Sequence, residues 1–327
     1  MNVGIAGAGN IVPHFLEAQR SIAELQVNAV CASKHSRERM GRLAEDYSIS
    51  SIYYDYNAML ADHCLDVVYI AVPNHLHYPF SKWALEQGKS VICEKPFCSN
   101  ADELRSLAAL AEEKGLYLFE AISNQYFPTY QKVRELLPRL GDIKIVEMNF
   151  SQYSSRYDAF RRGEVPPVFD PAKSGGALMD LNVYNIHFIL GLFGPPEDVQ
   201  YFANIEKNID TSGTLILKYP GFICMATAAK DSKAPFYISI QGNEGCIHSD
   251  CPSNSFERFF FEAKDNRRTE YALNEEKGRL YHELKAFADM VAASDLQLNQ
   301  RRLEHSLAVQ QILDKARRQA GLTILQA

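Results

Sequence analysis

The sequence predicts an α/β protein. Its first part is expected to form a doubly wound parallel sheet, and its second an α+β domain with a large, mostly antiparallel open sheet. In residues 2–120, apolar runs of strand length alternate with helical segments, a pattern typical of βαβ units. The first apolar run leads directly into a Gly7-x-Gly9 pair that opens a helix. Beyond about residue 121, long strand-like segments follow one another across turns such as Tyr219–Pro220–Gly221, which favours antiparallel pairing.

The composition is that of an ordinary globular protein, for which we expect two domains at 1–121 and 122–327. The chain has 327 residues, 46% hydrophobic and 23% charged, and its net charge of −6 argues against a general nucleic-acid binder. No apolar run reaches the ~18 residues of a membrane span, so we expect no membrane partner. The N-terminus lacks the pattern of a signal peptide, and the seven cysteines include no C-x-x-C pair. Free thiols and a cytoplasmic location are expected.

The first domain is predicted to contain five strands separated by helices. The strands are expected at Val3–Ala6, Val27–Ala32, Asp66–Ala71, Ser90–Cys93 and Leu116–Phe119. The helices are expected from the turn at Pro13 to about Ala23, at Ser36–Asp46, at Leu76–Gln87, and from Asn100 to Lys114. Asn100 can cap the last of these, Glu103 can complete a capping box, and Gly115 suits the position after its end.

The second domain is predicted to contain two early helices, a series of strands and two closing helices. The early helices are expected at Pro128–Leu137 and Gly176–Leu190, and the closing helices at about Gly278–Ala293 and Leu303–Gln319. The strands are expected at Lys144–Phe150, Val199–Glu206, Gly213–Tyr219, Phe222–Thr227 and Tyr237–Gln241. Residues 154–175, rich in Arg, Pro and Gly, are predicted to form a loop.

The segment Gly7–Ala8–Gly9–Asn10–Ile11 is typical of a dinucleotide-binding turn. The first glycine permits a tight turn, and the second lets the backbone approach a pyrophosphate that lies on the helix N-terminus. Val12 occupies the place of the third glycine of this fingerprint. The alternative interpretation is a plain tight turn.

The end of the second strand indicates which dinucleotide is bound. Sites that prefer NAD often place an acidic residue about 20 residues beyond the glycines. Here the strand ends Cys31–Ala32–Ser33–Lys34 without an acid, and Arg37 follows. Ser33 can hydrogen-bond a phosphate oxygen, and Lys34, with Arg37 as a second candidate, can supply positive charge, so NADP(H) is favoured, with NAD(H) possible. The alternative is that Lys34 and Arg37 are ordinary solvated side chains.

Two further strand ends carry polar residues that are expected to border the ligand crevice. Pro73, Asn74 and His77 follow the third predicted strand, and a cofactor-loop role for Asn74 and His77 competes with simple packing of His77 at a helix start. His75 and His77 lack a matching cluster of acids or cysteines, so no metal site is predicted. Glu94–Lys95–Pro96 ends the fourth strand, where Lys95 can point into the crevice or can be a solvated strand end.

The helix that begins near Gly176 carries three reactive side chains at helical spacing. Asp180, Tyr184 and His187 stand at i, i+4 and i+7, so they share one helix face. An acid, a phenol and an imidazole suit proton transfer. The same pattern is also typical of an exposed polar helix face, and the sequence leaves both interpretations open.

Four motifs together resemble one known family. They are Gly7-x-Gly9-x-Ile11, Pro73–Asn74-x-x-His77, Glu94–Lys95–Pro96 and Gly175–Gly176–Ala177–Leu178–Met179–Asp180-x-x-x-Tyr184. In this order they resemble the glucose–fructose oxidoreductase/inositol dehydrogenase (Gfo/Idh/MocA) family, and most of all its dihydrodiol dehydrogenase-like branch. The resemblance covers nearly the whole chain and implies an N-terminal Rossmann domain that binds a nicotinamide cofactor. It also implies a C-terminal domain whose open sheet forms a homodimer or homotetramer interface.

The resemblance implies that Lys95 and Tyr184 are catalytic and that Asp180 belongs to the substrate site. One segment departs from the family, because Ser123 and Gln125 stand where Trp and Arg are frequent. This departure predicts a pocket of different size and charge near the nicotinamide.

The predicted function is hydride transfer between a nicotinamide cofactor and a secondary alcohol or ketone of a sugar, polyol or diol. Tyr184 would exchange the hydroxyl proton, Lys95 would act as a nearby cation, and Asp180 would orient the substrate or Lys95. Glu94 would contact the nicotinamide ribose or neighbouring backbone. The alternative is a sensor that binds NADP(H) and a sugar without turnover.

Overall fold

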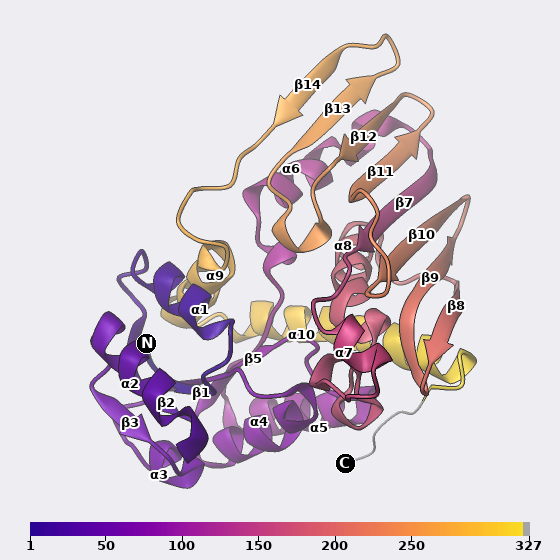
Figure 1. Ribbon diagram of the computed structural model, residues 1–327. Helices are drawn as coiled ribbons and strands as arrows, with labels where there is room; N and C mark the ends of the chain where they lie inside the picture. Colours follow the sequence, from indigo (N-terminus) through magenta and orange to yellow (C-terminus); the bar gives the residue numbers. More distant parts are fainter. Residues whose placement is uncertain (323–327) are drawn as a thin grey trace. The chain divides into compact units, whose positions relative to one another are not determined.

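The structure, a computed structural model, describes residues 1–322 and divides into two units (Figure 1). Unit 1 consists of Met1–Ala121 and Glu275–Leu307, and unit 2 of Ile122–Asn274 together with the chain from Ala308 onward. Residues 275–307, expected in the second domain, therefore belong to the first unit. Side chains of this segment pack against residues far earlier in the sequence. For example, the rings of Phe119 and Phe287 stack with their centroids 4.5 Å apart.

Unit 1 is built on a six-stranded parallel sheet with the order β3-β2-β1-β4-β5-β6. Its strands are β1 (Asn2–Ala6), β2 (Gln26–Cys31), β3 (Ser51–Tyr53), β4 (Val67–Ile70), β5 (Ser90–Glu94) and β6 (Leu118–Ala121). Its helices are α1 (Val12–Gln19), α2 (Arg37–Tyr47), α3 (Tyr56–Leu60), α4 (His77–Glu86), α5 (Ala101–Lys114), α9 (Tyr281–Ala292) and the first half of α10 (Leu296–Gln319). The five predicted strands are present, whereas β3 and α3 were not predicted.

Local signals explain several element ends in unit 1. The Asn100 side chain accepts a hydrogen bond from the Glu103 amide at 2.9 Å, and Gly115 ends α5 with φ of 63°. The Glu103 carboxylate accepts a hydrogen bond from the Ser99 amide at 2.8 Å. Helix α1 ends at Gln19, earlier than predicted, because Ile22 turns back into the core and is 1% exposed.

At the β6 edge of the parallel sheet, the side chain of Asn299 binds the strand backbone. The amide nitrogen of Leu118 in β6 donates to Asn299 Oδ1 at 3.3 Å, and Asn299 Nδ2 donates to the Leu118 carbonyl at 3.0 Å. Asn299 thus satisfies both backbone groups of Leu118, which a further strand would otherwise bind.

Unit 2 is built on an eight-stranded sheet with the order β14-β13-β12-β11-β7-β10-β9-β8, and Figure 1 shows these strands side by side. The strands are β7 (Ile143–Ser151), β8 (Asp198–Glu206), β9 (Ile209–Tyr219), β10 (Phe222–Ala229), β11 (Tyr237–Gly242), β12 (Gly245–Ser249), β13 (Phe259–Ala263) and β14 (Arg268–Tyr271). All neighbours are antiparallel except β7 and β10, which are parallel. The mostly antiparallel sheet agrees with the prediction, although β12, β13 and β14 were not predicted.

One face of this sheet packs on the helices of unit 2. These are α6 (Pro128–Leu136), α8 (Val183–Phe193) and the second half of α10, while the short α7 (Tyr157–Arg161) packs in a separate small cluster. Along β11, buried Ile238 and Ile240 alternate with more accessible residues such as Tyr237, as expected for a sheet with one covered face. On the other face, Phe202 is 61% exposed and Ile223 is 42% exposed.

One segment of unit 2 corrects an expectation about membranes. Pro171–Phe193 is long and apolar enough to pass a test for a membrane-spanning helix, although no such run was expected. However, 72% of the tested window is buried inside the structure. The buried core helix of a globular protein can have the same length and apolar composition, and we interpret this segment as part of the core of unit 2.

Candidate active site

The predicted cofactor residues of unit 1 lie at one edge of the parallel sheet. Gly7 follows β1, Ser33 follows the end of β2, Pro73 follows β4 and Lys95 follows β5. Since the strands are parallel, their carboxyl ends meet at the same edge, where open α/β sheets bind ligands. The structure thereby brings these residues together.

The glycine loop fits a dinucleotide. Gly7 has φ of +123°, and a Cβ atom there would lie 2.2 Å from the carbonyl oxygen of Ala71, so only glycine allows the loop to pack beside β4. A Cβ atom on Gly9 would come no closer than 3.9 Å to that oxygen, so this side of the loop is open. Helix α1 starts at Val12 without a side-chain cap, so no side chain of its own competes with a pyrophosphate for the helix N-terminus. The Val12 amide donates to the Gly9 carbonyl at 3.2 Å, and Pro13 has no amide hydrogen.

A basic residue that the sequence analysis did not single out contacts this loop. Arg39 in α2 donates from Nη2 to Asn10 Oδ1 at 3.1 Å. Ser33, Lys34 and Arg37 are exposed in and just after the turn that follows β2. The sequence feature that could have identified Arg39 is its position two residues after Arg37, close to the predicted phosphate-binding turn.

His77 connects two of the predicted site segments. Its ring is 1% exposed, with Nδ1 2.8 Å from the Pro96 carbonyl oxygen and Nε2 2.9 Å from that of Val72. Burial lowers the pKa of His77 below its usual value. His77 therefore joins the loop after β4 to the Glu94–Lys95–Pro96 turn, which favours the packing interpretation over direct contact with the cofactor.

Glu94 points into a buried group of ionisable side chains. The Tyr69 hydroxyl donates to Glu94 Oε1, and burial raises the pKa of Glu94. Burial and then the nearby Glu94 raise the pKa of Glu283 in α9 well above its usual value, while Arg279 opposes this shift. Glu94 also accepts a hydrogen bond from the Lys95 backbone, so the expected contact with neighbouring backbone is present beside the tyrosine hydroxyl. Lys95 follows directly and precedes a cis Pro96.

In unit 2, the start of the helix that carries Asp180 is held by a buried carboxylate. Leu178–Asn182 form a π-helical turn, an irregularity frequent at functional sites. Asp210 Oδ2 accepts from the Leu178 amide at 2.7 Å and from the Tyr201 hydroxyl at 2.8 Å. Burial raises the pKa of Asp210 to about 6. Gly176 has φ of +108°, and a Cβ there would lie 2.0 Å from Asp210 Oδ1.

Asp180 is paired with a buried cation. Lys230 Nζ lies 2.7 Å from Asp180 Oδ2, and the Lys230 side chain is only 3% exposed. The Asp180 side chain is 27% exposed. The sequence analysis did not identify Lys230, which stands alone in the run Ala228–Ala229–Lys230 and belongs to no motif.

The rest of the predicted polar stripe is buried. Tyr184 is 4% exposed and His187 is fully buried, so the alternative of an exposed polar helix face is wrong. Every residue of this helix from Val183 to Leu190 is buried. Its backbone is bound by residues of the departing segment: Asn124 Nδ2 donates to the Tyr184 carbonyl and Gln125 Nε2 to the His187 carbonyl, both at 2.8 Å. Ser123 and Gln125 are themselves buried, with 3% and 2% exposure.

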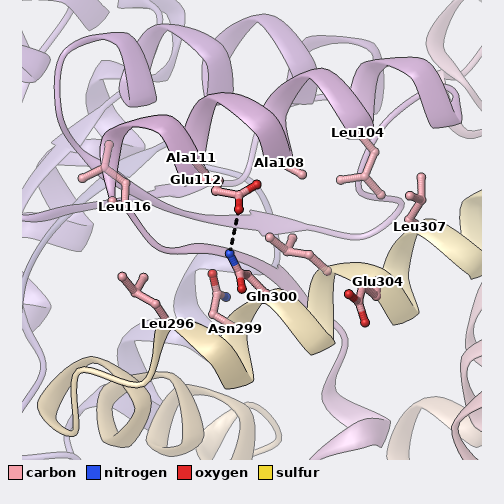
Figure 2. Close-up of a pocket in the computed structure, with 12 residues that line it drawn as sticks. Leu104, Ala108, Ala111, Glu112, Leu116, Leu296, Asn299, Gln300, Glu304 and Leu307 are labelled. Carbon is pink, nitrogen blue, oxygen red and sulfur yellow. Dashed lines mark hydrogen bonds between the residues drawn. The ribbon is translucent and has the colours of Figure 1, made fainter.

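Two further features complete the survey of residues 1–322. Within this range, no group of three or more His, Cys, Asp or Glu side chains is arranged to hold a metal ion. A pocket of about 280 Å³ lies between α5 and the first half of α10, with Leu104 and Leu307 at one end and a hydrogen bond from Gln300 to Glu112 across it (Figure 2). The residues that line this pocket include no predicted site residue.

Comparison with known proteins agrees with this architecture. Residues 1–122 match the family described as an oxidoreductase family with an NAD-binding Rossmann fold, and residues 130–248 match the GFO/IDH/MocA C-terminal domain. The scyllo-inositol 2-dehydrogenase (NADP(+)) of Bacillus subtilis is 34% identical over 321 residues, which cover 97% of this chain and 96% of the relative. The trans-1,2-dihydrobenzene-1,2-diol dehydrogenase of Sus scrofa is 32% identical, with coverage of 74% and 72%.

Solved structures give the same fold. A 3-ketoreductase from Actinomadura kijaniata, solved with NADP and TDP-benzene, superposes with a TM-score of 0.84 at 22% identity, with coverage of 97% of each chain. The chain belongs to the Gfo/Idh/MocA family. It is accordingly an NAD(P)-dependent oxidoreductase, as the predicted resemblance implied.

Proposed function

We propose that this protein is an NADP(H)-dependent oxidoreductase that interconverts a secondary hydroxyl group and a ketone on a polyol or sugar. The observation that carries the proposal is the partly exposed, ion-paired carboxylate of Asp180, four residues before Tyr184 in one helical segment. A carboxylate accepts hydrogen bonds from hydroxyl groups, and a phenol can exchange a proton. The extent of the likeness to an NADP(+)-dependent scyllo-inositol dehydrogenase supports both the polyol and the cofactor.

The cofactor is proposed to lie along the carboxyl edge of the parallel sheet. Gly7, Gly9, Asn10 and Ile11 would bind the pyrophosphate, Ser33 and Lys34 the adenosine 2′-phosphate, and Pro73, Asn74, Glu94 and Lys95 the nicotinamide end. His77 would hold the last two segments together through the Val72 and Pro96 carbonyls. When bound, the nicotinamide supplies the hydride donor or acceptor. The exposed Lys34 ammonium supports the choice of NADP(H), because a phosphate group requires a positive partner.

Each catalytic residue has a separate proposed role. Tyr184 takes up or returns the proton of the reacting hydroxyl group. The Lys95 ammonium stabilises negative charge on the substrate oxygen and favours loss of the phenol proton. Asp180 accepts a hydrogen bond from a second substrate hydroxyl and so fixes the orientation of the substrate.

Turnover of Lys95→Ala and Tyr184→Phe on scyllo-inositol and a panel of sugars and polyols tests these roles. Each variant is expected to lose ~10²–10³ in kcat, as is typical when one stabilising donor is removed. Lys264→Ala and Tyr153→Phe are matched controls, because both side chains lie at the surface. Near-wild-type rates in both site variants would contradict the catalytic assignment. Binding of NADPH and polyol without any turnover would favour a sensor instead.

The cofactor preference is tested by titration with NADPH and NADH side by side. NADPH is expected to bind more tightly, and Lys34→Ala is expected to remove about 1–2 kcal/mol of that difference, since a charge-assisted hydrogen bond is lost. Lys264→Ala is the matched control, because Lys264 is an exposed lysine of unit 2 outside the proposed cofactor site. Tighter binding of NADH by the wild-type protein would contradict the preference.

Assembly and location complete the proposal. We infer a homodimer or homotetramer that forms through the face of the large sheet where Phe202, Ile223 and Tyr237 are exposed. Apolar groups gathered on one face favour a partner surface. The seven free cysteines support a cytoplasmic location, since the cytoplasm keeps thiols reduced.

A further inference from the structure

Lys230 is a buried cation at the end of β10 whose charge is directed at the proposed substrate site. The residue is 2% exposed, and its ammonium is 2.7 Å from Asp180 Oδ2 and 3.0 Å from the Val168 carbonyl oxygen. The ammonium also lies 4.8 Å from the centre of the Phe169 ring. A lysine is rarely buried so completely unless it is paired. Among residues 1–322, Asp180 is the anionic side chain in contact with the Lys230 ammonium, so the burial of Lys230 is explained by that carboxylate.

The two members of this ion pair differ in accessibility. The Lys230 side chain is 3% exposed, whereas that of Asp180 is 27% exposed. The cation therefore acts from inside unit 2 on a carboxylate that reaches the surface. The oxygens of a carboxylate in an ion pair accept hydrogen bonds and donate none. The Asp180 carboxylate is thus suited to hydroxyl groups as ligands and unsuited to a carbonyl oxygen.

Lys230 also connects Asp180 to the loop that precedes it. The Val168 carbonyl accepts both from Lys230 Nζ at 3.0 Å and from the Gly176 amide at 3.1 Å. The backbone amide of Lys230 donates to Thr211 in β9 at 2.8 Å. One residue therefore fixes the loop, the sheet and the proposed substrate-binding carboxylate with respect to one another inside unit 2.

We propose that Lys230 is a positioning residue that holds the Asp180 carboxylate correctly directed for a substrate with a hydroxyl group beside the reacting carbon. The inference rests on the proposed function, in which Asp180 binds substrate. It adds the substrate class: vicinal polyols are selected over simple secondary alcohols, because only a polyol offers a second hydroxyl to the fixed carboxylate. Loss of Lys230 removes the ion pair that directs the Asp180 carboxylate, so it weakens polyol binding more than it slows the chemical step.

The test compares Lys230→Met, Lys230→Gln and Asp180→Asn, with the polyol of highest turnover from the panel above as substrate. Lys230→Met is expected to raise KM for the polyol about 30-fold while kcat changes less than about threefold. Lys230→Gln keeps a hydrogen-bond donor without the charge and is expected to raise KM about tenfold. In the Asp180→Asn background, Lys230→Met is expected to change KM by less than about twofold, because the pair is already broken.

The matched control is Lys89→Met. Lys89 is the buried lysine of unit 1, 7% exposed, and its ammonium donates to the carbonyls of Asp62 and Leu65 at 2.8 and 2.7 Å. This variant is expected to unfold at lower temperature with an unchanged polyol KM. NADPH affinity is measured in parallel and is expected to be unaffected by any change at Lys230.

The possible outcomes distinguish a failure of the proposed role of Lys230 from a failure of the proposed function. A KM within twofold of wild type in Lys230→Met and Lys230→Gln, while Asp180→Asn raises KM, overturns the role of Lys230 alone. Additive effects of the two substitutions overturn it as well. An unchanged KM in Asp180→Asn, or no polyol turnover by the wild-type protein, overturns the proposed function together with the inference. If Lys230→Met does not fold, the KM of Lys230→Gln for the polyol decides whether Lys230 has the proposed role.

Discussion

Replacing Asp210 with asparagine is expected to remove a pH-dependent destabilisation of unit 2. Burial raises the pKa of Asp210 from 3.8 to about 6, although the Leu178 amide and the Tyr201 hydroxyl oppose the shift. The native state therefore keeps this proton where the unfolded chain has released it. The free energy of unfolding consequently falls as the pH rises from about 4 to about 6. A difference of about two pKa units, at ~1.4 kcal/mol for each, predicts a loss of about 3 kcal/mol.

Asparagine retains an oxygen that can accept from Leu178 and Tyr201, but it carries no charge at any pH. Relative to wild type, Asp210→Asn is therefore expected to gain about 3 kcal/mol between about pH 4 and about pH 7. Urea unfolding followed by circular dichroism at several pH values measures this gain. The single tryptophan, Trp83, lies in unit 1, and its fluorescence gives an internal reference. The exposed Asp142→Asn is the control. A difference from wild type that does not vary with pH would refute the reasoning.

Two further predictions concern packing and assembly in unit 2. Gly176→Ala is expected to lower the free energy of unfolding by at least about 2 kcal/mol more than Gly163→Ala, because both have positive φ but only at Gly176 would the new Cβ meet another residue. Equal denaturation midpoints for these two variants would show that the contact with Asp210 is unimportant. Phe202→Glu is expected to weaken self-association at least ~10-fold by light scattering, since a buried phenylalanine contributes ~1.5–3 kcal/mol. Val165 is about as exposed as Phe202 but lies outside the sheet, so Val165→Glu should leave the molar mass unchanged. An unchanged molar mass in Phe202→Glu would argue against assembly through this face.

The elements of the parallel sheet could be predicted because their signals are local. Strands such as β4 and β5 are continuous apolar runs, and Asn100 and Gly115 mark the ends of α5. The three-residue β3 escaped prediction because it lies at the sheet edge and has no fully buried residue. The membership of residues 275–307 in unit 1 rests on contacts such as that between Phe119 and Phe287, which no local pattern encodes.

The candidate site was predictable where a motif fixed the residues. Gly7 and the Glu94–Lys95–Pro96 turn stand at strand ends that apolar periodicity locates. Lys230 and Arg39 could not be found in this way, because each acts through one contact to a residue distant in sequence. The burial of His187 was also unpredictable, since the spacing of polar residues on a helix is the same whether neighbouring elements cover that face or leave it in water.

The Asn299 side chain on the edge of β6 has a consequence for synthesis on the ribosome. Unit 1 begins at the first residue but is completed only by residues 275–307, so all of the intervening chain is made first. At cellular rates this leaves the amide and carbonyl of Leu118 without Asn299 for on the order of 10 s. During that time the nascent sheet has an open edge able to pair with another chain. Asn299 is made late in translation, and its binding to Leu118 then closes this edge. The hydrogen bonds of Asn299 therefore end the period in which the newly made protein can aggregate through the edge of β6.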